Sequence, residues 1–172
     1  MTDTLDWAEK TTDIPAGGLD RQREATADEL GRIAKALDIL SVADLSSHYR
    51  IVAISGGAYR LSGSISANVE QACVVSLEPV RGAVKAAFDV EFWPDLKSEE
   101  SEEEASILSG SDVELLEHGL IPVGRIVFET LSASLDPYPR REGAEFDWKD
   151  PKVEEPGAHS PFATLAKLKD KG

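Results

Sequence analysis

Thiol and imidazole side chains are the groups in this chain best suited to covalent or acid–base chemistry. Cys73 is the only cysteine, and His48, His118 and His159 are the three histidines. A cysteine nucleophile needs a base within hydrogen-bond reach and a third group that orients this base. His48 opens a predicted strand and is the best candidate, whereas His118 lies beside an acid-rich stretch and His159 in a polar segment. No catalytic signature surrounds them, so a cysteine-dependent enzyme is the least favoured hypothesis and we assign no catalytic residue.

The residues also give no indication of a metal or cofactor site. Structural zinc sites use about four Cys or His ligands with paired spacing, and the candidates here all lie in different segments. The acid-rich stretch lacks the alternating Asp or Asn and the glycine of a calcium loop. The pair Gly56-Gly57 precedes a strand, whereas a phosphate loop precedes a helix. We therefore predict no metal ligand, no cofactor and no small-molecule substrate.

The charge of the chain limits the partners it can bind. Its 172 residues include 18 Lys and Arg against 32 Asp and Glu, for a net charge of −14. This field repels phosphates and suits basic protein partners. A single cysteine excludes an internal disulfide framework, the start MTDTLDWAEK does not read as a signal peptide, and no run approaches the ~18–20 apolar residues that span a bilayer. We predict a cytoplasmic protein without membrane contact.

More than half of the excess negative charge lies in residues 95–117, which hold nine acids and one base. We expect residues 95–112 to form a mobile, solvated acidic loop that can dock a basic protein tail. The candidate interaction surface comprises Glu99, Glu100, Glu102, Glu103, Glu104, Glu129, Asp136, Tyr138 and Arg140. The alternative function, direct RNA binding, would use Arg140, Arg141 and the C-terminal lysines Lys167, Lys169 and Lys171.

Helical patterns flank the middle of the chain. Residues 26–38 begin with Thr26 and Glu29 at the spacing of a capping box, and Leu30, Ile33, Ala34 and Leu37 then form one apolar stripe. Residues 121–135 predict a second helix, in which Pro122 occupies the first turn. Its predicted buried stripe consists of Val123, Ile126, Val127, Thr130, Leu131 and Ser134.

The middle of the chain alternates as β-strands do. Residues 47–55 and 58–70 predict two strands joined by the turn at Gly56-Gly57, and residues 83–94 predict another. In the second strand, Leu61, Ile65, Ala67 and Val69 face one side. The same alternation, carried forward, puts Cys73, Val75 and Leu77 on the inner face, where a cysteine is usually an inert, small apolar residue.

These elements predict the α+β class: an antiparallel β-sheet, a meander that is open or barrel-like, packed with two or three helices. We expect a flexible N-terminal tail over residues 1–15, with Trp7 or Ile14 as its candidate anchor, and one domain over residues 16–146. Residues 147–159 read as a linker, and residues 160–170 as a C-terminal helix that docks on the domain or on a partner.

The chain resembles the YceD-like family in three segments that occur in order: VEQACVVSLEPV (69–80), FETLSASLDPYPR (128–140) and SPFATLAKLK (160–169). The family is a domain of unknown function annotated for large ribosomal RNA subunit accumulation, and the similarity is greatest to its alphaproteobacterial branch. The resemblance implies a non-enzymatic, cytoplasmic factor of ribosome assembly. It also implies a partner that is a ribosomal protein or a large-subunit assembly intermediate.

The chain departs from this family at one informative position. Many relatives carry Cys-x-x-Cys where this chain has Cys73 and Ser76, and further cysteines after the second helix, where DPYPRREGAEF has none. Any zinc or redox site of those relatives is therefore expected to be missing here. No catalytic or metal-binding role is carried over to this chain.

Overall fold

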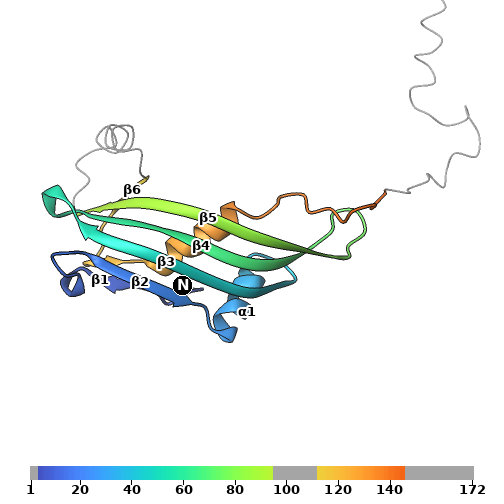
Figure 1. Cartoon of the computed structure of the whole chain (residues 1–172), viewed down its shortest axis with the longest axis horizontal. Helices are drawn as coiled ribbons and strands as arrows, with labels where there is room; N and C mark the ends of the chain where they lie inside the picture. Colours follow the sequence, from blue (N-terminus) through green and yellow to red (C-terminus); the bar gives the residue numbers. More distant parts are fainter. Residues whose placement is uncertain (1–3, 95–111, 146–172) are drawn as a thin grey trace, which may run out of the picture.

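The computed structural model describes residues 4–94 and 112–145 (Figure 1). Seven strands and two α-helices follow one another along these residues, with short 3-10 turns at Thr11–Asp13 and Ser55–Gly57. In chain order, the elements are β1 (Glu9–Lys10), β2 (Leu19–Glu24), α1 (Ala27–Ala36), β3 (Ser41–Ala53), β4 (Tyr59–Ala72), β5 (Pro79–Trp93), β6 (Asp112–Leu115), β7 (Leu120–Ile121) and α3 (Val123–Ala133).

The main sheet has five strands in the order β2-β3-β4-β5-β6, and β1 pairs separately with β7. Strands β2 to β5 are consecutive and antiparallel, which confirms the predicted α+β class and the meander. β6 runs parallel to β5 and pairs with it only at Val90–Trp93. Over residues 4–94 and 112–145 the outer strands β2 and β6 do not pair with each other, so the sheet is open rather than barrel-like.

Both helices contribute to one hydrophobic core beneath the same face of the sheet (Figure 1). α1 packs on β3, and α3 packs on β4 and β5. The predicted alternation of β4 and β5 is confirmed, because one side of each strand is buried and the other is exposed. The largest fully buried core side chains are Tyr49, Phe92, Ile33, Leu45, Ile51, Leu61, Ile121 and Leu131.

The strands extend beyond their predicted ends. β3 begins at Ser41 rather than at residue 47, and a bulge between Val42 and Asp44 shifts its register against β4. The bulge changes which residues face inward on its two sides. The first residues of β3 therefore do not continue the alternation that predicts the rest of the strand. β2 was not predicted, because its residues LDRQRE are almost all polar, as suits an exposed edge strand.

The helix at Ala27–Ala36 forms as its sequence predicts. The Thr26 hydroxyl accepts a hydrogen bond from the Glu29 backbone N–H, and the Glu29 carboxylate accepts one from the Thr26 N–H at 2.8 Å. Glu29 also accepts a hydrogen bond from the indole N–H of Trp7 at 3.0 Å. Burial alone would raise the pKa of Glu29, but these hydrogen bonds from Thr26 and Trp7 outweigh it and lower the pKa.

The expected flexible tail over residues 1–15 is wrong for the residues that the structure describes. Leu5 and Trp7 are buried, and β1 pairs with β7. The carboxylate of Glu9, only 5% exposed, accepts hydrogen bonds from Tyr49 at 2.6 Å, Arg23 at 3.1 Å and Arg21 at 3.2 Å. The partners of this segment lie far away in sequence, so the local composition did not reveal them.

The other boundaries are tested only in part. Asp112 belongs to β6, so the acidic segment ends before the predicted residue 112. Residues 95–111, most of the predicted linker and the predicted helix at 160–170 lie outside the described residues. Ser134, predicted to be buried on the second helix, is exposed because α3 ends at Ala133. Neither helix in the described ranges has the length and apolarity needed to cross a membrane.

Candidate interaction surfaces

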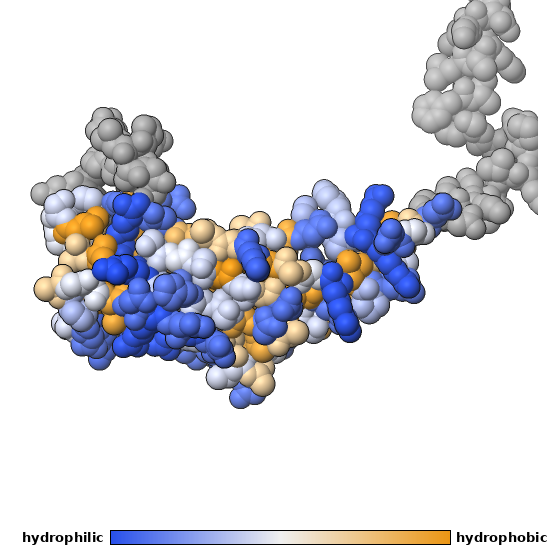
Figure 2. All heavy atoms as spheres, viewed as in Figure 1, coloured by the Kyte–Doolittle hydropathy of each residue, from blue (hydrophilic) through white to orange (hydrophobic). Residues whose placement is uncertain are grey.

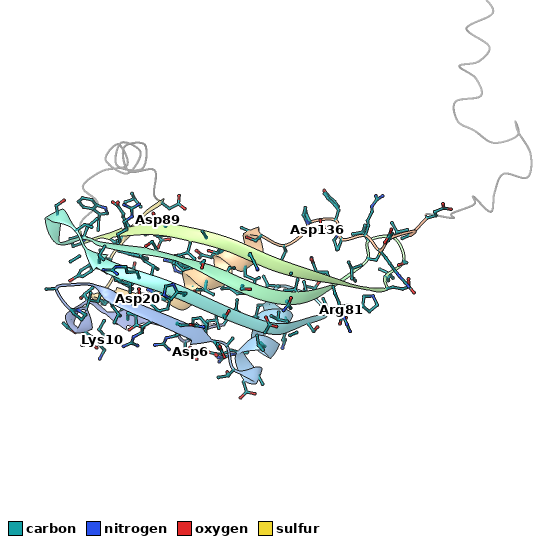
Figure 3. All side chains as sticks on the ribbon, viewed as in Figure 1. Asp6, Lys10, Asp20, Arg81, Asp89 and Asp136 are labelled. Atoms are coloured by element: carbon teal, nitrogen blue, oxygen red, sulfur yellow. The ribbon has the colours of Figure 1, made fainter. Side chains whose placement is uncertain are left out.

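The candidate surface predicted from the sequence is divided between two parts of the fold. Glu129 lies on α3, close to β6, whereas Asp136, Tyr138 and Arg140 follow α3 and lie near the turn between β4 and β5. Figure 3 shows Asp136 well separated from Asp89, which lies near Glu129. The remaining candidates, residues 99–104, lie outside the described residues, so their expected role stays a prediction.

The turn at residues 73–78, called here the Cys73 turn, is closed by backbone hydrogen bonds. The N–H of Cys73 donates to the carbonyl of Glu78 at 2.8 Å, and that of Leu77 donates to the carbonyl of Cys73 at 2.9 Å. The expectation that Cys73, Val75 and Leu77 share the inner face of a strand is therefore wrong. Cys73 is buried, but Leu77 takes a φ of 62° and is 76% exposed.

The segment after α3 packs against the Cys73 turn. The N–H of Val74 donates to the carbonyl of Pro139 at 2.9 Å, and the amide of Gln71 donates to the carbonyl of Asp136 at 3.0 Å. The guanidinium of Arg141 forms an ion pair with Glu78. Two of the three segments that carry the family resemblance are thus in direct contact, although more than sixty residues separate Gln71 from Asp136.

The sulfur of Cys73 accepts hydrogen bonds, which corrects its interpretation as an inert apolar residue. The backbone N–H groups of Ser76 and Arg141 each lie 3.4 Å from Sγ. Hydrogen bonding from the Ser76 side chain, followed by the backbone N–H groups of Arg141, Ser76 and Val75, lowers the pKa of Cys73 to about 6. Among the described residues, no hydrogen bond links Cys73 to a histidine, and His48 instead contacts Asp20 at 2.8 Å.

The low pKa of Cys73 predicts a pH-dependent contribution to stability. The pKa is depressed on folding, so the thiolate stabilises the fold fully above the unfolded pKa of about 8.5. That stabilisation is lost as the pH falls through about 6. We expect the difference in free energy of unfolding between the wild type and Cys73→Ala to grow from pH 6 to pH 9, as measured by urea denaturation. A difference that stays constant over this range would contradict the assignment.

Three large side chains around the Cys73 turn are exposed to solvent. Val74 is 47% exposed, Leu77 76% and Tyr138 73%. They stand beside the charged pair of Glu78 and Arg141. On the face shown in Figure 2, apolar side chains likewise lie in small patches between charged ones. This end of the molecule therefore exposes large apolar side chains next to an ion pair.

A second surface, called here the acidic groove, lies between β5, β6 and α3. It encloses about 510 Å³. Its lining includes the apolar residues Phe88 and Ile126 and the four acidic residues Asp89, Asp112, Glu114 and Glu129. The lining residues are Ala86, Ala87, Phe88, Asp89, Val90, Asp112, Glu114, Ile126, Glu129, Thr130, Ala133 and Ser134.

Two arginines offset part of the negative charge of the acidic groove. Arg125 contacts Glu129 at 3.2 Å and also pairs with Glu114, which raises the pKa of Arg125. Arg60 donates two hydrogen bonds to Asp89, at 2.8 and 2.6 Å. Four carboxylates against two arginines leave the groove with a net negative charge. The i, i+4 spacing of Arg125 and Glu129 was the one signal in the sequence for this arrangement.

The side chains around these surfaces do not form a metal site within residues 4–94 and 112–145. No group of three or more His, Cys, Asp or Glu is arranged there to hold an ion.

Comparison with known proteins gives one match. A family model described as "Large ribosomal RNA subunit accumulation protein YceD" matches residues 61–169. This range begins in β4 and includes the Cys73 turn, the acidic groove and the segment that follows α3. No curated protein and no solved structure matches the chain.

Proposed function

Because the chain belongs to the YceD family of large ribosomal RNA subunit accumulation proteins, we propose that it supports this accumulation by binding another protein. The partner would be a ribosomal protein or a large-subunit assembly intermediate, met in the cytoplasm. The chain would act without catalysis, as a binding factor. The family description names a role in rRNA accumulation and mentions no reaction.

The observation that carries this proposal is the acidic groove in a chain of net charge −14. A groove with excess carboxylate and apolar lining residues suits a basic polypeptide and repels phosphate. Ribosomal proteins are basic because they bind RNA. A protein of opposite charge could therefore recognise them before or during their assembly.

Direct RNA binding is the weaker alternative for the described residues. Arg141 is paired with Glu78, and Arg81 with Glu70, so these guanidinium groups already have carboxylate partners. Arg140 is exposed, but it lies beside these pairs rather than in a continuous basic stripe. Phosphate binding depends on several uncompensated cations close together. The C-terminal lysines lie outside the described residues.

Removal of the chain from its cell is expected to lower the ratio of large-subunit to small-subunit rRNA. The measurement is the quantification of both rRNAs in a deletion strain, with the wild-type gene restored as control. Cys73→Ala should restore the ratio as well as the wild type does, because no catalytic role is proposed for the thiol. An unchanged ratio in the deletion strain would refute the proposed function.

A binding experiment separates the protein partner from RNA. The purified chain should bind a basic ribosomal protein at low salt and give no mobility shift with large-subunit rRNA fragments. Replacing the five glutamates within residues 99–104 by serine tests whether the acidic segment takes part, and weaker protein binding is expected. A salt-dependent shift with RNA alone would favour the RNA-binding alternative.

A further inference from the structure

Strand β5 is paired along its full length on one side only. β4 covers residues 79–92 of β5, whereas β6 pairs only with Val90–Trp93. Within the part of the chain that the structure describes, residues 79–89 therefore have no strand on the other side. An unpaired strand edge presents backbone donors and acceptors that can bind another strand.

The hydrogen bonds at the end of β5 show which residues present these groups. The carbonyl of Trp93 accepts a hydrogen bond from the N–H of Leu116 at 2.7 Å, so the backbone of Trp93 points away from β4. From Phe92 to Pro79, each residue of β5 pairs with the next residue of β4, and no bulge interrupts this register. Since backbone direction alternates along a strand, the residues that point to the free edge are Arg81, Ala83, Lys85 and Ala87.

The acidic groove adjoins this free edge. Its lining includes Ala86 and Ala87 on β5, and Asp112 at the start of β6. A strand placed against Ala87 would therefore continue the line of β6 and would lie between β5 and α3. Because Ala87 is small and exposed, its side chain leaves the backbone open to a close approach.

We propose that an extended basic segment of a partner protein adds to β5 as a new strand in line with β6. The backbone of this segment pairs with the free edge around Ala87, and its cationic side chains meet the carboxylates of Asp112 and Glu129. Its apolar side chains contact the groove lining at Phe88 and Ile126. Binding of this kind combines backbone hydrogen bonds with side-chain selectivity. The inference rests on the proposed function in that the partner is a protein.

Charge complementarity selects a basic segment over other occupants. The groove carries four carboxylates, which outnumber the paired Arg60 and Arg125 and the exposed Lys85 on the same edge of β5. Asp112 is exposed and can meet an incoming cation without moving a packed side chain. Glu129 is also exposed, but it shares Arg125 with Glu114, so a cation there would join an existing ion pair. An acidic segment or a nucleic acid would be repelled by the same groups.

The first test uses a synthetic peptide of alternating lysine and valine as the probe. Ala87→Pro removes the outward N–H of Ala87 and keeps the ladder to β4, because proline is tolerated where the N–H faces solvent. We expect Ala87→Pro to weaken peptide binding about tenfold or more. Ala87→Ser, which keeps both the N–H and a small side chain, should bind as the wild type does. Equal affinity of the wild type and Ala87→Pro would overturn the proposal.

Amide hydrogen exchange of the wild-type chain provides a second test that does not depend on the proline variant. The amides of Ala83, Lys85 and Ala87 should exchange quickly in the free chain, whereas those of Val84 and Ala86 should be slow. Saturating peptide should protect Ala87 and its outward neighbours. Protection of these amides in the free monomer would show that another part of this chain already covers the edge, and would overturn the proposal.

Matched peptides and charge variants separate the contributions of backbone and charge. A peptide N-methylated at alternate residues, and a peptide of alternating glutamate and valine, should bind at least about tenfold more weakly than the lysine peptide. The double variant Asp112→Asn, Glu129→Gln should weaken lysine-peptide binding and reduce its salt dependence. Equal binding of all three peptides would overturn the proposal.

Sedimentation of the chain without peptide tests whether a second copy occupies the edge. A dimer that Ala87→Pro abolishes would assign the edge to a second copy and overturn the proposal. The peptide experiments can fail while rRNA accumulation still depends on the chain, in which case only this inference is lost. If instead the deletion strain keeps its normal rRNA ratio, the proposed function fails, and the peptide results then concern binding alone.

Discussion

Gly124→Ala is expected to lower the free energy of unfolding by about 3 kcal/mol, because overpacking a closed contact costs this order of energy. A Cβ at position 124 would lie 2.3 Å from the carbonyl oxygen of Leu5 and 2.8 Å from its Cβ. The N–H of Gly124 also donates to the carbonyl of Trp7 at 2.7 Å. The substitution therefore pushes the N-terminal segment away from α3 and breaks its backbone contact.

Gly31→Ala is the matched control for this prediction. Gly31 lies within α1, is exposed, and has no atom within 4 Å of the position of an added Cβ. Alanine stabilises a helix by up to about 1 kcal/mol relative to glycine, so this variant should be slightly more stable than the wild type. Urea denaturation measures both variants. A Gly124→Ala variant as stable as Gly31→Ala would contradict the close packing of Leu5 on α3.

Glu9→Ala is expected to destabilise the fold by about 3 kcal/mol, since removing one member of a buried charged network leaves its partners unpaired. The Glu9 carboxylate accepts hydrogen bonds from the buried hydroxyl of Tyr49 and from two arginines, Arg21 and Arg23. The arginines are 43% and 32% exposed and can regain water. The Tyr49 side chain is fully buried, which makes the loss of its acceptor the larger cost.

Tyr49→Phe separates the hydroxyl contact from the rest of the network. It removes the donor to Glu9 and the acceptor for Arg23 Nε, and it leaves Glu9 paired with both arginines, so we expect a loss of only about 1 kcal/mol. Burial raises the pKa of Tyr49 to about 12, and the hydrogen bond to Glu9 acts in the same direction. The measurement is again urea denaturation, at neutral pH. A loss for Glu9→Ala no larger than that for Tyr49→Phe would contradict the expected cost of leaving the Tyr49 hydroxyl and the arginines without their acceptor.

Both predictions concern residues that hold the N-terminal segment against the rest of the domain. Trp7 links this segment to the capping box of α1 through Glu29, and Gly124 links it to the start of α3. The family match begins only at residue 61, so most of the residues that make these N-terminal contacts lie outside the matched range. The proposed binding edge on β5 lies within it. The stability of the fold and the proposed binding site can therefore be tested with separate sets of variants.

The sequence alone determined those features that depend on residues close together in the chain. The capping box of Thr26 and Glu29 was predictable because one helical turn brings residues three apart into contact. The alternation of β4 and β5 was predictable because successive side chains point to opposite faces of a strand, and here one face packs on the core while the other faces water. A turn was predictable at Gly56-Gly57 because glycine takes positive φ without strain, and both residues do so, at 76° and 77°. The loop is longer than the predicted two-residue turn, since Ser55–Gly57 form a 3-10 turn between Ile54 and Ala58.

Only the tertiary structure decided which distant segments meet. The sequence predicted Trp7 or Ile14 as an anchor of the N-terminal segment, and Trp7 is indeed buried. It did not show that Glu9 is buried, because its partner Tyr49 lies 40 residues away. It did not show that Cys73 receives the N–H of Arg141, 68 residues further along. The sequence joined Glu129 and Asp136 into one candidate surface, whereas the fold separates them. Contacts of this kind follow from how whole faces of helices and strands pack, and local patterns carry no information about that packing.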